Sequence, residues 1–157
     1  SFGVPVHHYL LIDFRGVREL VDALGGIDIT VDKPMRYRDR TAGLTVNFQP
    51  GRHHMDGKQA EAYLRFRHDA MGDIGRIRRQ QYFITAVKEK LADPGVVFKL
   101  PELVQLSQKY TRTDLGPQEL LAIANFGRSV PQNHVRLATL PGRASSYEAV
   151  SYWIINP

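Results

Sequence analysis

The spacing of hydrophobic positions changes from element to element in the first part of the chain. Residues 6–13 (VHHYLLID) are rich in strand-forming side chains and predict a strand. Residues 14–24 carry apolar side chains at helical spacing, with Asp13 as a candidate N-cap and Gly25-Gly26 as a stop. Residues 27–31 (IDITV) alternate and predict a second strand. A strand–helix–strand unit is the building block of α/β folds, so the pattern predicts this fold class.

The rest of the chain mixes strand and helix patterns separated by Pro and Gly. We expect an Arg-rich loop over residues 34–43, a turn at Pro50-Gly51, and Asp56 as the N-cap of a helix. No internal repeat or linker divides the chain, so we expect a single domain over residues 1–157. The expected strands are residues 44–48, 135–140 and 149–155, and the expected helices are residues 58–63, 75–91, 101–110 and 117–128.

Arginine dominates the charge of the chain. Lys and Arg number 21 against 16 acidic residues, a net charge of +5, which favours an anionic partner such as a phosphate, a nucleic acid or an acidic membrane. Nine arginines fall between residues 36 and 79, and arginine suits forked contacts with phosphate oxygens. The lack of cysteine excludes disulfides, thiolate metal sites and cysteine nucleophiles. No apolar run reaches the roughly 18 residues of a membrane-spanning helix.

Residues 63–81 (YLRFRHDAMGDIGRIRRQQ) concentrate the candidate chemistry. Two arginines in the first part share one face if that stretch is extended, and three polar residues share one face of the first turn of the next helix. A helix N-terminus offers unpaired N–H groups and positive potential, to which guanidinium groups add charge-assisted bonds. The pattern predicts an anion site, with a solvated basic face as the alternative. The candidates are Arg65, Arg67, Asp73 in a tight loop between Gly72 and Gly75, Arg76, Arg79 and Gln80.

Three blocks of sequence resemble the LytR–CpsA–Psr family. They are residues 11–31 (LIDFRGVRELVDALGGIDITV), 43–68 (GLTVNFQPGRHHMDGKQAEAYLRFRH) and 72–83 (GDIGRIRRQQYF). Their order and spacing match the family over roughly residues 6–90, and RFRH…GD.GR..RQQ is the most specific stretch. The resemblance implies a three-layer αβα domain with a mixed central sheet flanked by helices. Because the chain opens on strand-like sequence, we expect it to be the C-terminal part of that domain.

The resemblance also implies a function. Family members move a phosphoglycan from a polyprenyl-pyrophosphate carrier onto peptidoglycan or another wall polymer. They are anchored by an N-terminal transmembrane segment, act on the extracytoplasmic face of the bacterial cytoplasmic membrane, and use a divalent cation, commonly Mg²⁺. By position, the pyrophosphate contacts fall on Arg65, Arg67, Arg76 and Gln80, with Arg79 beside them, and we expect Asp73, Arg67 and Arg76 to carry catalysis. The metal ligands are expected on an upstream region that this chain does not include.

A polyprenyl tail would need a long apolar groove. The candidate lining residues are Leu20, Leu24, Phe83, Val87 and Leu121, for which an ordinary core position is the alternative. Two rival functions stay open. One is hydrolysis of similar lipid pyrophosphates with water as the acceptor. The other is a basic nucleic-acid-binding regulator, suggested by the pI of about 9.6. No helix-turn-helix pattern supports the regulator, so we expect no nucleic-acid partner.

Several smaller signals accompany this site. Zinc binding by His7-His8 or His53-His54 is disfavoured, because adjacent residues on a strand point to opposite faces. His68-Asp69 is a candidate base near the site, with a loop hydrogen bond as the alternative. Three further arginines, which extend the anionic surface or form a solvated loop, are Arg36, Arg38 and Arg40.

Overall fold

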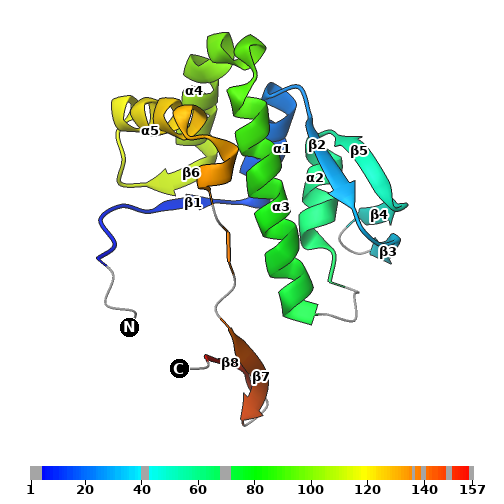
Figure 1. Cartoon of the computed structure of the whole chain (residues 1–157). Coiled ribbons are helices and arrows are strands. Elements are labelled where there is room, and N and C mark those ends of the chain that lie inside the picture. The colour runs from blue at the N-terminus through cyan, green and yellow to red at the C-terminus, as the bar shows by residue number, and fades with distance from the viewer. Residues whose placement is uncertain are drawn as a thin grey trace.

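The computed structural model describes residues 5–39, 43–67, 72–135, 137–138, 141–147 and 150–155 (Figure 1). Helices and strands are interspersed along the chain, which confirms the expected α/β class. The α-helices are α1 (Phe14–Ala23), α2 (Gly57–Arg65), α3 (Gly72–Ala92), α4 (Leu100–Tyr110) and α5 (Pro117–Ser129), and the 3-10 helices are η1 (Pro94–Lys99) and η2 (Gln132–His134). The strands are β1 (Leu10–Ile12), β2 (Ile27–Val31), β3 (Met35–Asp39), β4 (Leu44–Phe48), β5 (Gly51–Met55), β6 (Thr111–Thr113), β7 (Gly142–Tyr147) and β8 (Val150–Ile155).

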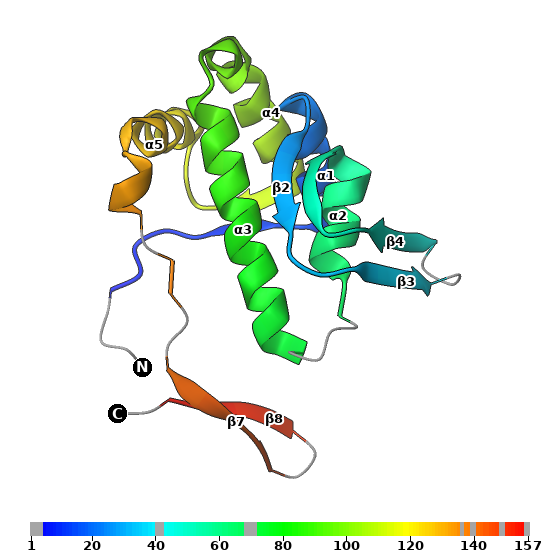
Figure 2. The same cartoon turned by 45° about the vertical axis from the view of Figure 1, so that its right-hand side comes forward.

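The described strands form antiparallel pairs. The pairs are β1–β6, β2–β5, β3–β4 and β7–β8. Within the described ranges no ladder joins them into the one mixed central sheet that the resemblance implies. Helix α3 packs against β2, and the β7–β8 hairpin extends away from the helices in both views (Figure 2).

The pairs β2–β5 and β3–β4 are two parts of one bent hairpin. Val31 lies opposite Gly51 and Met35 lies opposite Phe48, so three residues on one side face two on the other. Pro34 and Pro50 stand in this gap, and proline has no N–H to donate to a ladder. When the two sides of a hairpin have unequal numbers of residues between paired positions, the hairpin bends, as it does at a β-bulge. The bend turns β3–β4 away from the direction of β2–β5 (Figure 2), although both pairs contribute buried side chains to the core.

Three strand predictions need correction. The loop expected over residues 34–43 is wrong for β3, where the buried Met35 and half-buried Tyr37 alternate with exposed arginines that disguise the strand. Strand β5 was not predicted, because its segment GRHHM has little apolar character and depends on pairing with β2. The strand expected over residues 135–140 is wrong at its described positions 135, 137 and 138, and the chain instead forms β7 as the partner of β8.

Local signals position the helices around the core. The Asp13 carboxylate accepts a hydrogen bond from Gly16 N at 2.7 Å, which confirms the predicted cap of α1. The Asp56 carboxylate accepts from Gln59 N at 2.8 Å and confirms the predicted start of α2. Gly57 lies so close to α1 that a Cβ atom there would collide with the Arg18 carbonyl. The largest fully buried side chains of the core are Val21, Leu24, Ile27, Val46 and Met55.

Candidate functional site

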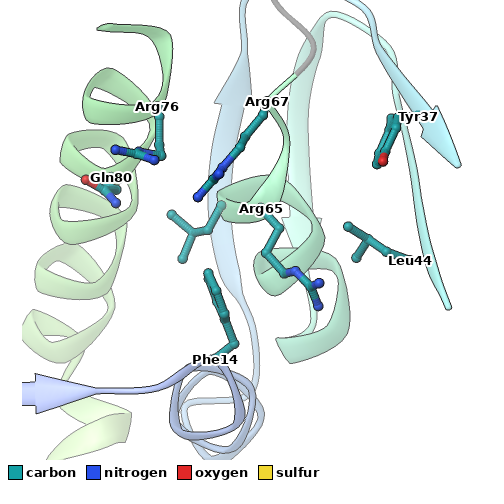
Figure 3. A pocket seen from close by; sticks show the side chains of 8 residues that line it. Phe14, Tyr37, Leu44, Arg65, Arg67, Arg76 and Gln80 are labelled. Carbon is teal, nitrogen blue, oxygen red and sulfur yellow. The ribbon is translucent and has the colours of Figure 1, made fainter. Parts of the chain in front are cut away.

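A cavity of about 480 Å³ lies between α2, α3, the β3–β4 part of the bent hairpin and the start of α1 (Figure 3). Its lining combines cationic, amide, aromatic and aliphatic side chains. The lining residues are Phe14, Tyr37, Leu44, Leu64, Arg65, Arg67, Arg76 and Gln80. The structure therefore brings four of the predicted site residues into one cavity, although they come from separate elements.

Arg67, Arg76 and Gln80 gather on one side of this cavity. Arg76 and Gln80 lie one turn apart on α3, and Arg67 comes from the segment after α2. Figure 3 shows the heads of these three side chains lying near one another. Arg67 has no hydrogen bond or ion pair with any described residue. Two like charges and an amide donor on one side of a cavity favour an anion between them. We call these three residues the anion subsite.

Arg65 lines the same cavity but points elsewhere. Its Nη1 donates to Glu61 Oε1 at 2.9 Å, and its guanidinium carbon lies 5.5 Å from the centre of the Phe14 ring. Figure 3 shows its head turned away from Arg67 and Arg76. The condition under which Arg65 and Arg67 would share one face is not met, because α2 continues through Arg65 and the chain becomes extended only at Phe66. The binding role of Arg65 stays a prediction.

Arg79 lies outside the cavity lining. It is only 8% exposed, and its Nη2 donates to the carbonyl oxygen of Phe66 at 2.6 Å. Its guanidinium carbon also lies 5.4 Å from the centre of the Phe66 ring. These contacts hold the segment between Arg65 and Arg67 against α3. The geometry thus gives Arg79 a structural role, and its predicted contact with pyrophosphate stays a prediction.

The tight loop expected around Asp73 is instead the first turn of α3, which begins at Gly72 rather than at Gly75. The side chain of Asp73 lies outside the described residues, as do His68, Asp69 and Arg40. The catalytic role of Asp73 stays a prediction.

The sequence interpretation missed the uncharged wall of the cavity. The sequence pattern places Tyr37 in an expected loop and Phe14 in an apolar series at helical spacing, yet both line the cavity. Glu61 was also missed, although its spacing of four residues from Arg65 is that of a helical ion pair. Arg36 and Arg38 are exposed and alternate with Tyr37 along β3, so they lie on the opposite face of the strand from the cavity.

Comparisons with known proteins decide the family. All 157 residues, 1–157, match the LytR_cpsA_psr family. The chain belongs to the LytR–CpsA–Psr family. It is 30% identical to Regulatory protein MsrR of Staphylococcus aureus (strain COL), over 96% of this chain and 45% of that protein. It is 27% identical to the polyisoprenyl-teichoic acid–peptidoglycan teichoic acid transferase TagU of Oceanobacillus iheyensis, over 99% of this chain and 47% of that protein.

Solved structures agree with this membership. The crystal structure of B. subtilis TagV matches with a TM-score of 0.77 at 21% identity, over 98% of this chain and 59% of that one. This likeness shows that the LytR–CpsA–Psr chain shares the fold of TagV. The chain spans about half the length of the curated relatives it matches.

The described residues of this LytR–CpsA–Psr chain do not fit a Mg²⁺ ion. Among them, no group of three or more His, Cys, Asp or Glu side chains is placed to hold a metal. Mg²⁺ needs oxygen ligands, whereas the charged residues lining the cavity are arginines. The histidine pair on β5 is engaged elsewhere, because His53 bonds to Gln49 O at 2.7 Å and His54 bonds to Asp28 Oδ1 at 3.0 Å.

The resolved pKa shifts lie away from the cavity. Burial raises the pKa of Tyr63 well above its usual range, so this core phenol stays neutral. The hydrogen bond from His54 lowers the pKa of Asp28 on β2. The backbone N–H of Tyr9 lowers the pKa of the exposed Asp114. These groups support the fold, and none of them lines the cavity.

The candidates for lining a lipid groove lie in three different settings. Leu24 is 2% exposed and belongs to the core, so its groove role is wrong. Phe83, Val87 and Leu121 are partly buried against that core. Leu20 lines a second cavity of about 170 Å³ between α1, α4 and the β1–β6 pair. Among the described residues, no helix has the length and apolarity to cross a bilayer.

Proposed function

We propose that this chain carries the pyrophosphate-gripping part of a transferase that moves a phosphoglycan from a polyprenyl-pyrophosphate carrier onto peptidoglycan or another wall polymer. Membership of the LytR–CpsA–Psr family supports this, as does the relative TagU, whose name describes a teichoic acid transferase. The observation that carries the proposal is the meeting of Arg67, Arg76 and Gln80 in one cavity. The same proposal places the protein at the extracytoplasmic face of the cytoplasmic membrane, held by an N-terminal anchor.

The chemistry fits the groups that the cavity offers. A doubly substituted pyrophosphate carries about two negative charges, which Arg67 and Arg76 balance. Because α3 begins at Gly72, Arg76 lies one turn inside the helix, so its own guanidinium and not the helix N-terminus supplies the positive charge. Phosphoryl transfer depends mainly on positioning and on stabilising charge, which guanidinium groups supply.

In the proposed reaction a sugar hydroxyl of the acceptor attacks the phosphorus that bears the glycan. A new P–O bond forms to the acceptor oxygen, and the bond to the bridging oxygen breaks. The lipid monophosphate leaves with that electron pair, and the hydroxyl proton passes to a base, for which Asp73 is the candidate on this chain. Mg²⁺ belongs to the proposal as a source of further charge stabilisation. Its ligands would have to come from outside the described residues, among which no group of three or more His, Cys, Asp or Glu side chains is placed to hold it.

Arg67→Ala and Arg76→Ala test the anion subsite. Each change removes one guanidinium from the developing charge, so we expect transfer by the full-length protein to fall about a hundredfold, or about 3 kcal/mol in the barrier. Binding of inorganic pyrophosphate to this chain, measured by calorimetry, should weaken in parallel, while the far-ultraviolet circular dichroism spectrum stays unchanged. Arg78→Ala is the matched control, because Arg78 is exposed on the same helix and lies outside the cavity lining.

Two results would count against the proposal. If both variants bind pyrophosphate and turn over like the Arg78→Ala control, the anion subsite is wrongly placed. Product analysis separates transfer from hydrolysis, since only transfer leaves a phosphodiester to the acceptor sugar. Release of free phosphoglycan with no bridged product would favour a lipid-pyrophosphate hydrolase instead.

A further inference from the structure

Glu61 on α2 is a buried acidic residue beside a cavity that gathers positive charge. It is 8% exposed, and each of its carboxylate oxygens accepts a hydrogen bond from a different arginine. Oε1 accepts from Arg65 at 2.9 Å, and Oε2 accepts from Arg18 of α1 at 3.3 Å. We propose that Glu61 is a positioning residue that holds Arg65 apart from the anion subsite and so limits how tightly the cavity grips a diphosphate. This inference rests on the proposed function of the cavity.

The helix geometry fixes the first of two restraints on Arg65. Glu61 and Arg65 stand four residues apart on α2, a spacing that places the two side chains on the same face. The Glu61 side chain is 11% exposed, so water screens this pair less than it screens a surface pair. A bidentate contact of Arg65 with phosphate would have to compete with this carboxylate for the same guanidinium.

The Phe14 ring supplies the second restraint. The guanidinium carbon of Arg65 lies 5.5 Å from the centre of this ring, within the range of a cation–π contact. Figure 3 shows the head of Arg65 turned away from Arg67, Arg76 and Gln80, although all of these side chains line one cavity. The cavity is thereby divided into a cationic anion subsite and a second part where the charge of Arg65 is already balanced.

This arrangement has a consequence for turnover. An arginine that moved freely into the anion subsite would bind substrate and product pyrophosphate or phosphate groups alike. Uniformly tighter binding of that kind slows release of product without lowering the barrier to reaction. Glu61 keeps the Arg65 guanidinium near the anion subsite, but the charge of Arg65 does not strengthen the binding of substrate before the reaction.

Arg18 offers a matched control for a purely structural role of Glu61. The Arg18–Glu61 pair links α1 to α2, and the side chain of Arg18 is 49% exposed. Arg18 does not line the cavity. If Glu61 served only to join the two helices, changes at Arg18 and Glu61 would alter stability alone, and pyrophosphate affinity would stay the same in both.

The test measures binding of inorganic pyrophosphate to this chain by calorimetry, with thermal unfolding recorded for each variant. Glu61→Gln keeps the size of the side chain and removes its charge, so Arg65 is freed to bond to pyrophosphate. One charge-assisted hydrogen bond, after subtracting the bonds to water that it replaces, corresponds to about tenfold tighter binding of pyrophosphate, which is the result we expect. Arg18→Ala should stay within about twofold of wild type. In the double variant Glu61→Gln/Arg65→Ala the gain should disappear, and affinity should match that of Arg65→Ala alone.

Glu61→Asp provides a second route if the glutamine variant does not fold. Aspartate is one methylene shorter and keeps the charge, so its ion pair with Arg65 is weaker from the same backbone position, and binding should again tighten, by less than in Glu61→Gln. Equal or weaker binding in the folded variants would overturn the inference. Loss of affinity in Arg67→Ala without a gain in Glu61→Gln would leave the proposed function standing and remove only the role of Glu61. Wild-type affinity in Arg67→Ala would remove the proposed function itself.

Discussion

Replacing Arg79 by methionine tests whether this buried arginine holds the segment between α2 and α3. In the native chain its Nη2 donates to Phe66 O at 2.6 Å, and its guanidinium carbon lies 5.4 Å from the centre of the Phe66 ring. Methionine keeps much of the aliphatic volume but has no donor. Phe66 would therefore lose both contacts with Arg79, while the packing around the side-chain stem would change little.

The size of the effect follows from three contributions. A hydrogen bond from a charged group stabilises by about 1.5–3 kcal/mol net. The contact of the guanidinium with the ring adds about 0.5–1 kcal/mol. Part of this loss of stability is offset, because the variant no longer bears the free-energy cost of taking a charged group out of water on folding. We expect a loss of about 2 kcal/mol, which for a chain of 157 residues lowers Tm by roughly 4–8 °C.

Urea unfolding followed by circular dichroism measures this loss. Arg78→Met is the matched control, since Arg78 is exposed on the same helix and should change stability by less than about 0.5 kcal/mol. Equal midpoints for Arg79→Met and Arg78→Met would refute the structural role. Because Phe66 lies between Arg65 and Arg67, Arg79→Met should also weaken pyrophosphate binding, whereas Arg78→Met should leave it unchanged.

Two further predictions concern packing and pH. Gly57→Ala should cost about 2–4 kcal/mol in urea unfolding, because its Cβ would collide with the Arg18 carbonyl, and a variant as stable as wild type would contradict the close approach of α1 and α2. The hydrogen bond from His54 lowers the pKa of Asp28, so the stabilisation by this carboxylate is present above the unfolded pKa of about 3.9 and is lost as pH falls through the lower folded pKa. Asp28→Asn should therefore cost less than about 1 kcal/mol near pH 7, because Asp28 is half-exposed, and almost nothing near pH 2; an equal cost at both pH values would contradict the assignment.

The helices were predictable because their signals are local. Asp13 and Asp56 cap α1 and α2 within three residues of their own positions. Gly25 and Gly26 adopt φ values of 78° and 90°, which suit glycine and end the first helix as predicted. Strand β5 was not predictable in the same way, since its hydrogen bonds come from β2, whose paired residues lie 20 to 28 positions earlier in the sequence.

The candidate site was predictable only in its charged part. The density of arginine and the resemblance pointed to Arg67, Arg76 and Gln80, which the cavity does bring together. The Tyr37 and Phe14 walls come from a strand and a helix that are distant in sequence, so no local pattern places them beside these residues. The direction of Arg65 depends on Glu61 and on where α2 ends, and boundaries of that kind are the least certain part of a sequence pattern.

The unequal spans between Val31 and Met35 and between Phe48 and Gly51 also decide which chemistry faces the cavity. Side chains alternate along a strand, so deleting one residue from the longer span would turn β3 over. Arg36 and Arg38 would then face inward in place of Tyr37, and a largely neutral wall would become a second cationic one. The face that β3 turns to the cavity therefore depends on the length of a proline-bearing connector as much as on the identity of the side chains.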